Sequence, residues 1–215
     1  DDGLVYSSDI VRQGSHSMGF HFTQADANEN DDRMGFDLRK NIGRNEAWAQ
    51  YWLYFPEGFD IVDGDFGKPW QADGGKLPGW TVLENNGSDQ AQAWLTFHDP
   101  ADIGETPHSE SGNILLNYYT EDNNKTDSAT KAWNKNGVIE PGNWYEITLY
   151  INTETGRIRG WVDGEKAYDV AGSNWEGRNV QWAHISHFGG GWYPPKEQTF
   201  YTDDLRMYSE NPLDN

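Results

Sequence analysis

The stretch Gln90-Ala91-Gln92-Ala93-Trp94-Leu95-Thr96-Phe97-His98 decides the fold class, because its side chains alternate between apolar and polar residues. A period of two is typical of a β-strand with one buried face. The apolar face holds Ala91, Ala93, Leu95 and Phe97. The opposite face combines hydrogen-bonding groups with an aromatic ring, which suits a surface that binds sugars. Its residues are Gln90, Gln92, Trp94, Thr96 and His98.

The same alternation recurs along the whole chain, between breaks rich in Gly, Pro, Asn and Asp. No stretch shows a sustained helical period. We therefore predict an all-β jelly roll, a sandwich of two antiparallel sheets. The predicted strands are 17–23, 33–39, 47–55, 80–84, 90–98, 113–121, 144–152, 157–162, 180–188 and 199–208.

The connections between strands differ in length and chemistry. Residues 152–156 and the Asp-Gly pair at 163–164 read as tight hairpin turns. Residues 64–79 form a long break rich in Gly and Pro, and 99–112 form a second polar one. Long ordered loops in small domains are usually functional, so we expect the first break to carry site residues.

The chain length of 215 residues suits one domain spanning residues 1–215. No window approaches eighteen consecutive apolar residues, and the first residues lack the features of a signal peptide. Cysteine is absent, which excludes disulfides and thiolate metal sites. We expect a soluble, mature, monomeric protein.

The charge narrows the choice of partner. A net charge of −19 opposes binding to nucleic acid and to anionic membranes. The acidic side chains are dispersed, as on a solvated surface. Adaptation to high salt would explain them, and at about 1 M salt the Debye length of ~3 Å would still let a negative polymer approach.

The aromatic content points to carbohydrate. Eleven Trp and eleven Tyr side chains are available, and such rings stack on sugars while keeping a polar edge. Strands are also enriched in aromatics for packing reasons, so most individual rings are expected in the core.

One pairing of segments resembles a known enzyme group. Residues 51–60, which read YWLYFPEGFD, are followed by Gly74-Gly75-Lys76-Leu77-Pro78-Gly79. This pairing is similar to polysaccharide lyases of families fourteen and twenty, the alginate and glucuronan lyases. Further similar segments follow in the same order at 142–144, 156–164, 187–192 and 200–205.

The resemblance implies a secreted, extracellular jelly roll whose concave sheet forms a cleft for an anionic polysaccharide. It also implies β-elimination at a uronic acid. That reaction requires a group that neutralises the uronate carboxylate, a base and an acid. No cofactor is needed for this chemistry.

Lys76 is the first catalytic candidate that the resemblance supplies, either as the base or as a clamp for the carboxylate. Tyr118 and Tyr119 occupy the place of the family's cleft tyrosines, and Tyr193 and Tyr201 compete for that role in the glucuronan-lyase arrangement. The strand 90–98 lacks the arginines of the alginate-lyase pattern. There Gln92 is expected to neutralise the carboxylate, and His98 to act as a base.

The remaining candidates are contacts to the polymer and to a metal. Asp203 and Asp204 are candidate ligands of a structural calcium ion, because calcium prefers carboxylate oxygens. The alternative is that they are ordinary carboxylates at the end of a strand. The candidate substrate-binding residues are Arg44, Gln50, Trp52, Gln90, Trp94, Asn117, Trp192, Lys196 and Tyr201.

Two other functions compete with a lyase. A glycoside hydrolase on a similar sandwich needs two carboxyls across the cleft, often alternating on one strand. The chain has no Glu-x-Asp-x-Glu string. A non-catalytic carbohydrate-binding module would use the aromatic rings without any base or acid.

Overall fold

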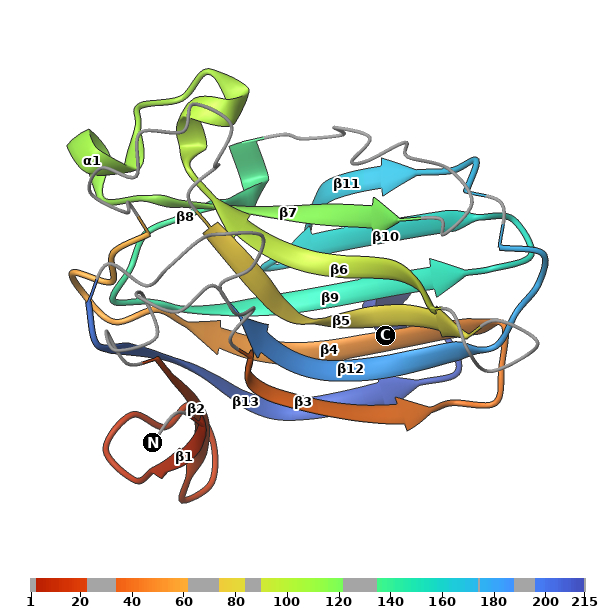
Figure 1. Cartoon of the computed structure of the whole chain (residues 1–215), viewed down its shortest axis with the longest axis horizontal. Helices are drawn as coiled ribbons and strands as arrows, with labels where there is room; N and C mark the ends of the chain where they lie inside the picture. The colour runs from red at the N-terminus through yellow and green to blue at the C-terminus, as the bar shows by residue number, and fades with distance from the viewer. Residues whose placement is uncertain are drawn as a thin grey trace.

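The computed structural model describes residues 3–22, 34–61, 74–83, 90–121, 135–173, 175–187 and 196–214. The thirteen strands among these residues form two antiparallel sheets that lie face to face (Figure 1). The seven-stranded sheet has the order β1-β2-β13-β4-β9-β10-β11, and the six-stranded sheet has the order β3-β12-β5-β6-β7-β8. The predicted all-β sandwich is confirmed.

The strands follow the alternation closely. They are β1 (Gly3–Ser7), β2 (Ser17–Phe22), β3 (Met34–Asn41), β4 (Glu46–Tyr54), β5 (Gly74–Leu83), β6 (Gln90–His98), β7 (Ile114–Glu121), β8 (Val138–Ile139), β9 (Trp144–Asn152), β10 (Arg157–Val162), β11 (Glu165–Val170), β12 (Val180–His187) and β13 (Gln198–Tyr208). The prediction missed β1, β8 and β11. Among the described residues, no helix is long and apolar enough to cross a membrane.

Short helical turns occupy part of the connections. Between β6 and β7 lie a 3-10 turn at Pro100–Ile103 and one helical turn, α1, at His108–Ser111. Asp99 holds them together, because its Oδ1 accepts hydrogen bonds from the backbone N–H groups of Ala101 and His108, both at 2.9 Å. Two more 3-10 turns lie at Lys135–Gly137 and Pro212–Asp214.

The two predicted tight turns are present. Asp163 and Gly164 have φ values of 50° and 77°, the left-handed pair that a two-residue hairpin requires between β10 and β11. Gly156, at φ 60°, closes the hairpin between β9 and β10. A Cβ there would lie 1.8 Å from the carbonyl oxygen of Ser173, so the backbone conformation and the space both require glycine.

The predicted break at 64–79 is wrong from residue 74 onward, because β5 begins at Gly74, and residues 64–73 lie outside the described residues. Pro78 misled the prediction, since proline lacks an N–H and disfavours a strand interior. In the fold it lies within a bulge, where the register of β5 with β6 shifts between Leu77 and Trp80. Lys76 is therefore on a strand rather than in a loop.

The core between the sheets is largely aromatic. The ring of Phe200 stacks on Phe20 at 4.7 Å and lies 5.3 Å from Phe55. Trp80 meets Trp182 edge to face at 5.0 Å. All five side chains are at most 2 % exposed, so much of the aromatic content serves packing rather than binding.

Replacing Phe200 by alanine should lower the free energy of unfolding by roughly 3 to 5 kcal/mol, because it leaves a cavity among buried rings. Urea denaturation followed by tryptophan fluorescence measures the change. Tyr6→Ala is the control, since Tyr6 is 73 % exposed. A loss of stability for Phe200→Ala no larger than for the control would contradict this account of the core.

His184 of β12 should make the stability depend on pH. The side chain is 5 % exposed, packs on Phe20 at 5.2 Å, and burial lowers its pKa to about 4 from 6.5. In the unfolded chain His184 therefore binds a proton below pH 6.5, whereas in the folded chain it binds one only below about pH 4. Stability falls by roughly 3 kcal/mol as the pH drops through this window.

Thermal unfolding of His184→Gln between pH 7 and 4 tests this assignment. The variant should lose less stability than the parent over the window, although it is weaker at pH 7. His16→Gln, at an exposed histidine, should keep the parent's slope. An unchanged slope in His184→Gln would show that other groups cause the pH dependence.

Candidate functional site

A row of paired residues crosses four strands of the six-stranded sheet. Lys76 of β5 pairs with His187 of β12 on one side and with Thr96 of β6 on the other. Thr96 pairs in turn with Asn117 of β7. Directly paired positions of an antiparallel sheet share a face. The register therefore brings these four positions onto the outer face of this sheet, which forms the front layer in Figure 1.

The row contains buried polar side chains. Thr96 is 3 % exposed and Asn117 is 5 % exposed, while Lys76 is half-buried. The Oγ1 atom of Thr96 and the Oδ1 atom of Asn117 have no hydrogen-bond partner within the described part of the chain. Buried polar atoms of this kind mark places where a ligand or water completes the bonding. We name Lys76, Thr96 and Asn117 the lysine row.

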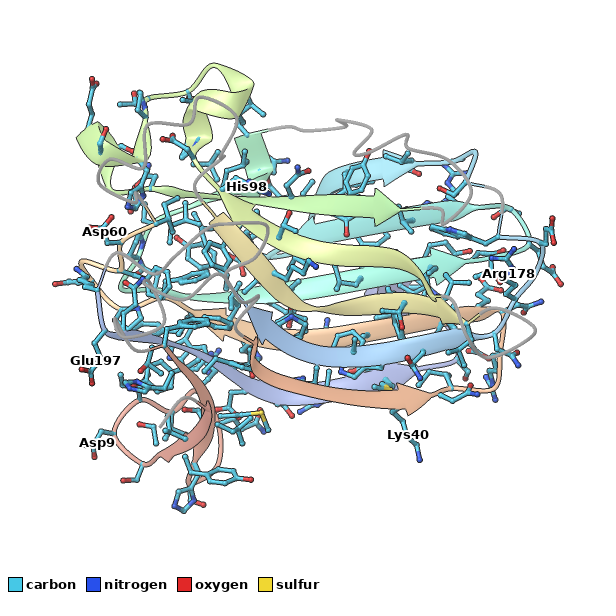
Figure 2. All side chains as sticks on the ribbon, in the orientation of Figure 1. Asp9, Lys40, Asp60, His98, Arg178 and Glu197 are labelled. Atoms are coloured by element: carbon cyan, nitrogen blue, oxygen red, sulfur yellow. The ribbon has the colours of Figure 1, made fainter. Side chains whose placement is uncertain are left out.

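His98 lies next to the lysine row. It follows Thr96 by two residues on β6 and pairs with Gly74, so it is a diagonal neighbour of Lys76 on the same face. Diagonal neighbours have Cβ atoms roughly 7 to 8 Å apart, which long side chains bridge. Figure 2 labels His98, half-buried, at the end of β6. The sheet thus places a titratable imidazole beside the lysine.

A second row lies further along the same strands. Thr81 pairs with Gln181 of β12 and with Gln92 of β6, and Gln92 pairs with Glu121 of β7. The hydroxyl of Thr81, which is fully buried, donates a hydrogen bond to Oε1 of Gln181 at 3.1 Å. The backbone thus places Gln92 on the face of Lys76. Its side chain, like those of Gln90 and Trp94, lies outside the described residues.

Tyr118 is the predicted catalytic residue that the structure contradicts. It pairs with Leu95, is 1 % exposed and packs its ring 4.8 Å from that of Tyr168 in the core. Alternation along β7 sends it away from the lysine row. Tyr119 pairs with Trp94 and has the backbone position that shares a face with Asn117. The side chain of Tyr119 and all of Tyr193 and Trp192 lie outside the described residues.

Three predicted substrate contacts lie on the opposite side of the molecule from Lys76. Gln50 and Trp52 of β4 and Tyr201 of β13 face outward from the seven-stranded sheet. Gln50 donates a hydrogen bond to Thr148 at 3.2 Å, and Tyr201 lies 6.3 Å from the ring of Tyr54. Alternation had correctly grouped the β4 residues on one face, but it carries no information on which sheet they join.

Trp52 is also covered. The guanidinium of Arg12 lies 4.1 Å from the centre of its ring, a cation–π contact that occupies the surface a sugar would use. The prediction of Trp52 as part of the cleft with Lys76 is therefore wrong.

The predicted contacts Arg44 and Lys196 lie in connections outside the lysine row. Arg44 is exposed, and its carbonyl accepts a hydrogen bond from the N–H of Val180 at 2.7 Å. Lys196 is exposed and donates a hydrogen bond to the carbonyl of Gly58 at 2.5 Å. These contacts attach neighbouring loops to the sandwich.

The candidate calcium ligands already have protein partners. Asp203 accepts hydrogen bonds from the backbone N–H groups of Arg12 and Gln13, both at 2.9 Å. Asp204 forms an ion pair with Arg206 at 2.6 Å. In the described ranges, no three His, Cys, Asp or Glu side chains gather as a metal site would require. Calcium at this position stays a prediction, and these contacts do not favour it.

Lys76 lines neither of two hollows that described residues form. One lies between the 57–60 and 108–113 segments and is lined by Glu57, Asp60 and His108. The other lies between β13, β12 and the N-terminal hairpin and includes Tyr6, Trp182 and Met207. The predicted concave cleft over Lys76 therefore stays a prediction.

Solved structures provide the comparison. The alginate lyase vAL-1 from Chlorella virus matches with a TM-score of 0.59 at 16 % identity, over 96 % of this chain and 90 % of that one. The marine PL-14 alginate lyase from Aplysia kurodai matches at 0.55 and 12 %, over 97 % and 88 %. The fold is that of the jelly-roll alginate lyases.

The same fold extends beyond those enzymes. The cellulose induced protein Cip1 matches with a TM-score of 0.54 at 14 % identity, over 96 % of this chain and 85 % of that one. No protein-family model and no curated protein matches the sequence. At these identities the comparisons establish the fold.

One residue of the row that crosses the six-stranded sheet, His187, was not predicted from the sequence. His187 begins the similar segment 187–192, but alternation along its strand did not predict it as a site residue. Its place opposite Lys76 depends on the register of β12 with β5, which shifts between Ala183 and His187. A shift of this kind is invisible to alternation alone.

Replacing Asp203 by alanine should loosen the segment that precedes β2. The carboxylate accepts two backbone hydrogen bonds from that segment, and bonds to a charged acceptor contribute about 1.5 to 3 kcal/mol each. We expect hydrogen exchange at the amides of Arg12 and Gln13 to accelerate at least tenfold. Asp9→Ala is the control. Unchanged hydrogen exchange at these two amides would show that Asp203 does not anchor the segment before β2.

Proposed function

We propose that the protein is a secreted polysaccharide lyase that cleaves a uronic-acid-containing polymer of the glucuronan or alginate type by β-elimination. The observation that carries the proposal is the register that aligns Lys76 with Thr96 and Asn117 on the outer face of the six-stranded sheet. The alginate-lyase fold supports it.

The reaction removes the proton from C5 of a uronate unit. Electrons of that C–H bond form a double bond between C4 and C5, and the bond from C4 to the glycosidic oxygen breaks. The departing oxygen takes a proton. Because the negative charge develops on the carboxylate, a cation and hydrogen-bond donors held against that group lower the barrier.

The residues divide between these tasks. The ammonium of Lys76 holds the carboxylate. The hydroxyl of Thr96, whose oxygen has no other partner among the described residues, and the Nδ2 group of Asn117 donate hydrogen bonds to it. His98 or Tyr119 takes and returns the proton, since either chain position shares the face of Lys76. The alternative role for Lys76 is that of the base itself.

The acidic surface bears on the substrate. A chain with a net charge of −19 repels a uronate polymer at low ionic strength, so we propose that cleavage is fastest in concentrated salt. The fold alone is also compatible with a carbohydrate-binding module that performs no chemistry. A hydrolase is less well supported, since the described side chains of the lysine row are lysine, threonine and asparagine rather than a pair of carboxyls.

Lys76→Ala should lower the cleavage rate roughly 100-fold or more, because it removes a charge that stabilises the transition state. The assay follows the ultraviolet absorbance of unsaturated uronate ends on glucuronan and alginate, at low and high salt. Lys40→Ala is the matched control, since Lys40 is an exposed strand lysine that points into solvent (Figure 2). Tyr118→Phe should also retain activity.

Lys76→Arg separates the two roles of the lysine. A guanidinium stays protonated, so the variant keeps partial activity if Lys76 is the clamp and loses all of it if Lys76 is the base. Full activity in a folded Lys76→Ala protein would remove the lysine from the mechanism. New reducing ends without the absorbance would identify a hydrolase, and polymer retention with neither signal would identify a binding module.

A further inference from the structure

The outer face of the seven-stranded sheet carries a cluster of basic side chains around one carboxylate. Nε of Arg157 and Nε of Arg159, both on β10, lie 2.7 and 3.2 Å from Oδ1 of Asp169 on β11. Nζ of Lys166 lies 3.2 Å from the other oxygen. We name these four residues the β10–β11 cluster. It contains three cations and one anion.

The cluster keeps a positive charge in a strongly negative protein. The hydrogen bond from Arg157 is the main cause that lowers the pKa of Asp169 to about 2, so its carboxylate is ionised at neutral pH. Three cations still outnumber it. The side chains of Arg157, Arg159 and Lys166 are 39 %, 29 % and 53 % exposed, so their charges are open to solvent. The charge complements a polyanion.

Aromatic rings lie directly beside the cluster. Trp48 of β4 packs 4.5 Å from Tyr150 of β9 and 5.3 Å from Trp161 of β10. The guanidinium of Arg159 lies 5.2 Å from the ring of Tyr150. Trp48 and Tyr150 are only 6 % and 8 % exposed, so they support Trp161, which is half-buried at the surface. The result is an aromatic surface adjoining fixed cations.

One carboxylate borders the aromatic side. The hydroxyl of Tyr150 donates a hydrogen bond to Glu46 at 2.9 Å. Counting Glu46 with the cluster still leaves more cations than anions. The basic side chains lie on β10 and β11, toward the edge of the sheet, and Glu46 lies on β4. The positive charge is therefore concentrated near Trp161.

This combination fits a sugar that carries an acidic group. Guanidinium groups bind carboxylates or sulfates through paired hydrogen bonds, and an indole ring stacks on the apolar face of a sugar. We propose that the β10–β11 cluster with Trp161 is a binding surface for an anionic polysaccharide, separate from the lysine row. The two surfaces belong to different sheets and face opposite sides of the sandwich.

Such a surface would hold the protein on the polysaccharide while another part of the same polysaccharide binds at the lysine row. A second point of attachment raises the effective concentration of polymer at the first one. Binding at the β10–β11 cluster should persist when Lys76 is replaced. It does not require the protein to be a lyase.

Affinity electrophoresis in gels containing sodium alginate tests the proposal, with hydroxyethylcellulose as the neutral polymer. All proteins carry Lys76→Ala, which prevents cleavage during the run. We expect the parent to be retarded by alginate only. Arg157→Gln with Arg159→Gln should weaken binding at least tenfold, and Trp161→Ala should weaken it severalfold. Lys40→Ala is the matched control for loss of a positive charge.

Asp169→Asn gives a change of the opposite sign. Removing the carboxylate at the centre of the cluster takes away the negative charge that Arg157, Arg159 and Lys166 all contact, so alginate binding should tighten severalfold at low salt. A merely structural role for the cluster predicts no such gain. Melting temperatures and near-ultraviolet circular dichroism show which variants are folded. If the variant with both arginines replaced does not fold, Lys166→Gln, which changes the most exposed cation of the cluster, replaces it in the binding test.

The outcomes separate this proposal from the proposed function. Equal retardation of the folded parent and arginine variants, or equal retention by the neutral polymer, would overturn the binding surface. In proteins that keep Lys76, cleavage of short oligouronates should be the same with and without the arginine changes. If alginate retards the protein but no polymer is cleaved, the proposed lyase activity is refuted and the proposed binding surface is not affected.

Discussion

A buried hydrogen bond between the sheets supports the geometry on which the candidate site depends. The hydroxyl of Tyr51, fully buried on β4, donates to the carbonyl of Pro78 at 3.0 Å. Burial raises the pKa of this tyrosine well above its usual value, so the hydroxyl remains a donor. Pro78 lies in the bulge of β5. The bond therefore joins the bulge to the opposite sheet.

The bulge decides which side chains of β5 reach each face. Leu77 and Trp80 both enter the core, although strict alternation would send one of them outward. Lys76 and Thr81 consequently share the outer face. Without the extra residue, either the lysine or the tryptophan would be misplaced, so one local irregularity serves both the core and the candidate site.

Sequence reasoning predicted the faces of single strands well and their assembly less well. The alternation of β6 correctly placed Leu95 and Phe97 in the core, and that of β4 grouped Trp52 with its neighbours. What it could not supply was the pairing of distant strands, which depends on packing between segments far apart in the chain. Gln50 and Trp52 were therefore assigned to the same surface as Lys76, although they belong to the other sheet. Alternation places Tyr118 and Tyr119 on opposite faces of β7, and the burial of Tyr118 shows that it is the one in the core.

The edges of the two sheets have a further consequence. An edge strand exposes unpaired backbone groups that can recruit another chain and start aggregation. In this fold β11 is an edge of the seven-stranded sheet, and β8, at one edge of the other, has only two residues. Lys166 and Asp169 place opposite charges along β11. The charged residues of that strand therefore also discourage sheet extension between molecules, because pairing with another strand would bring their charges against a second chain.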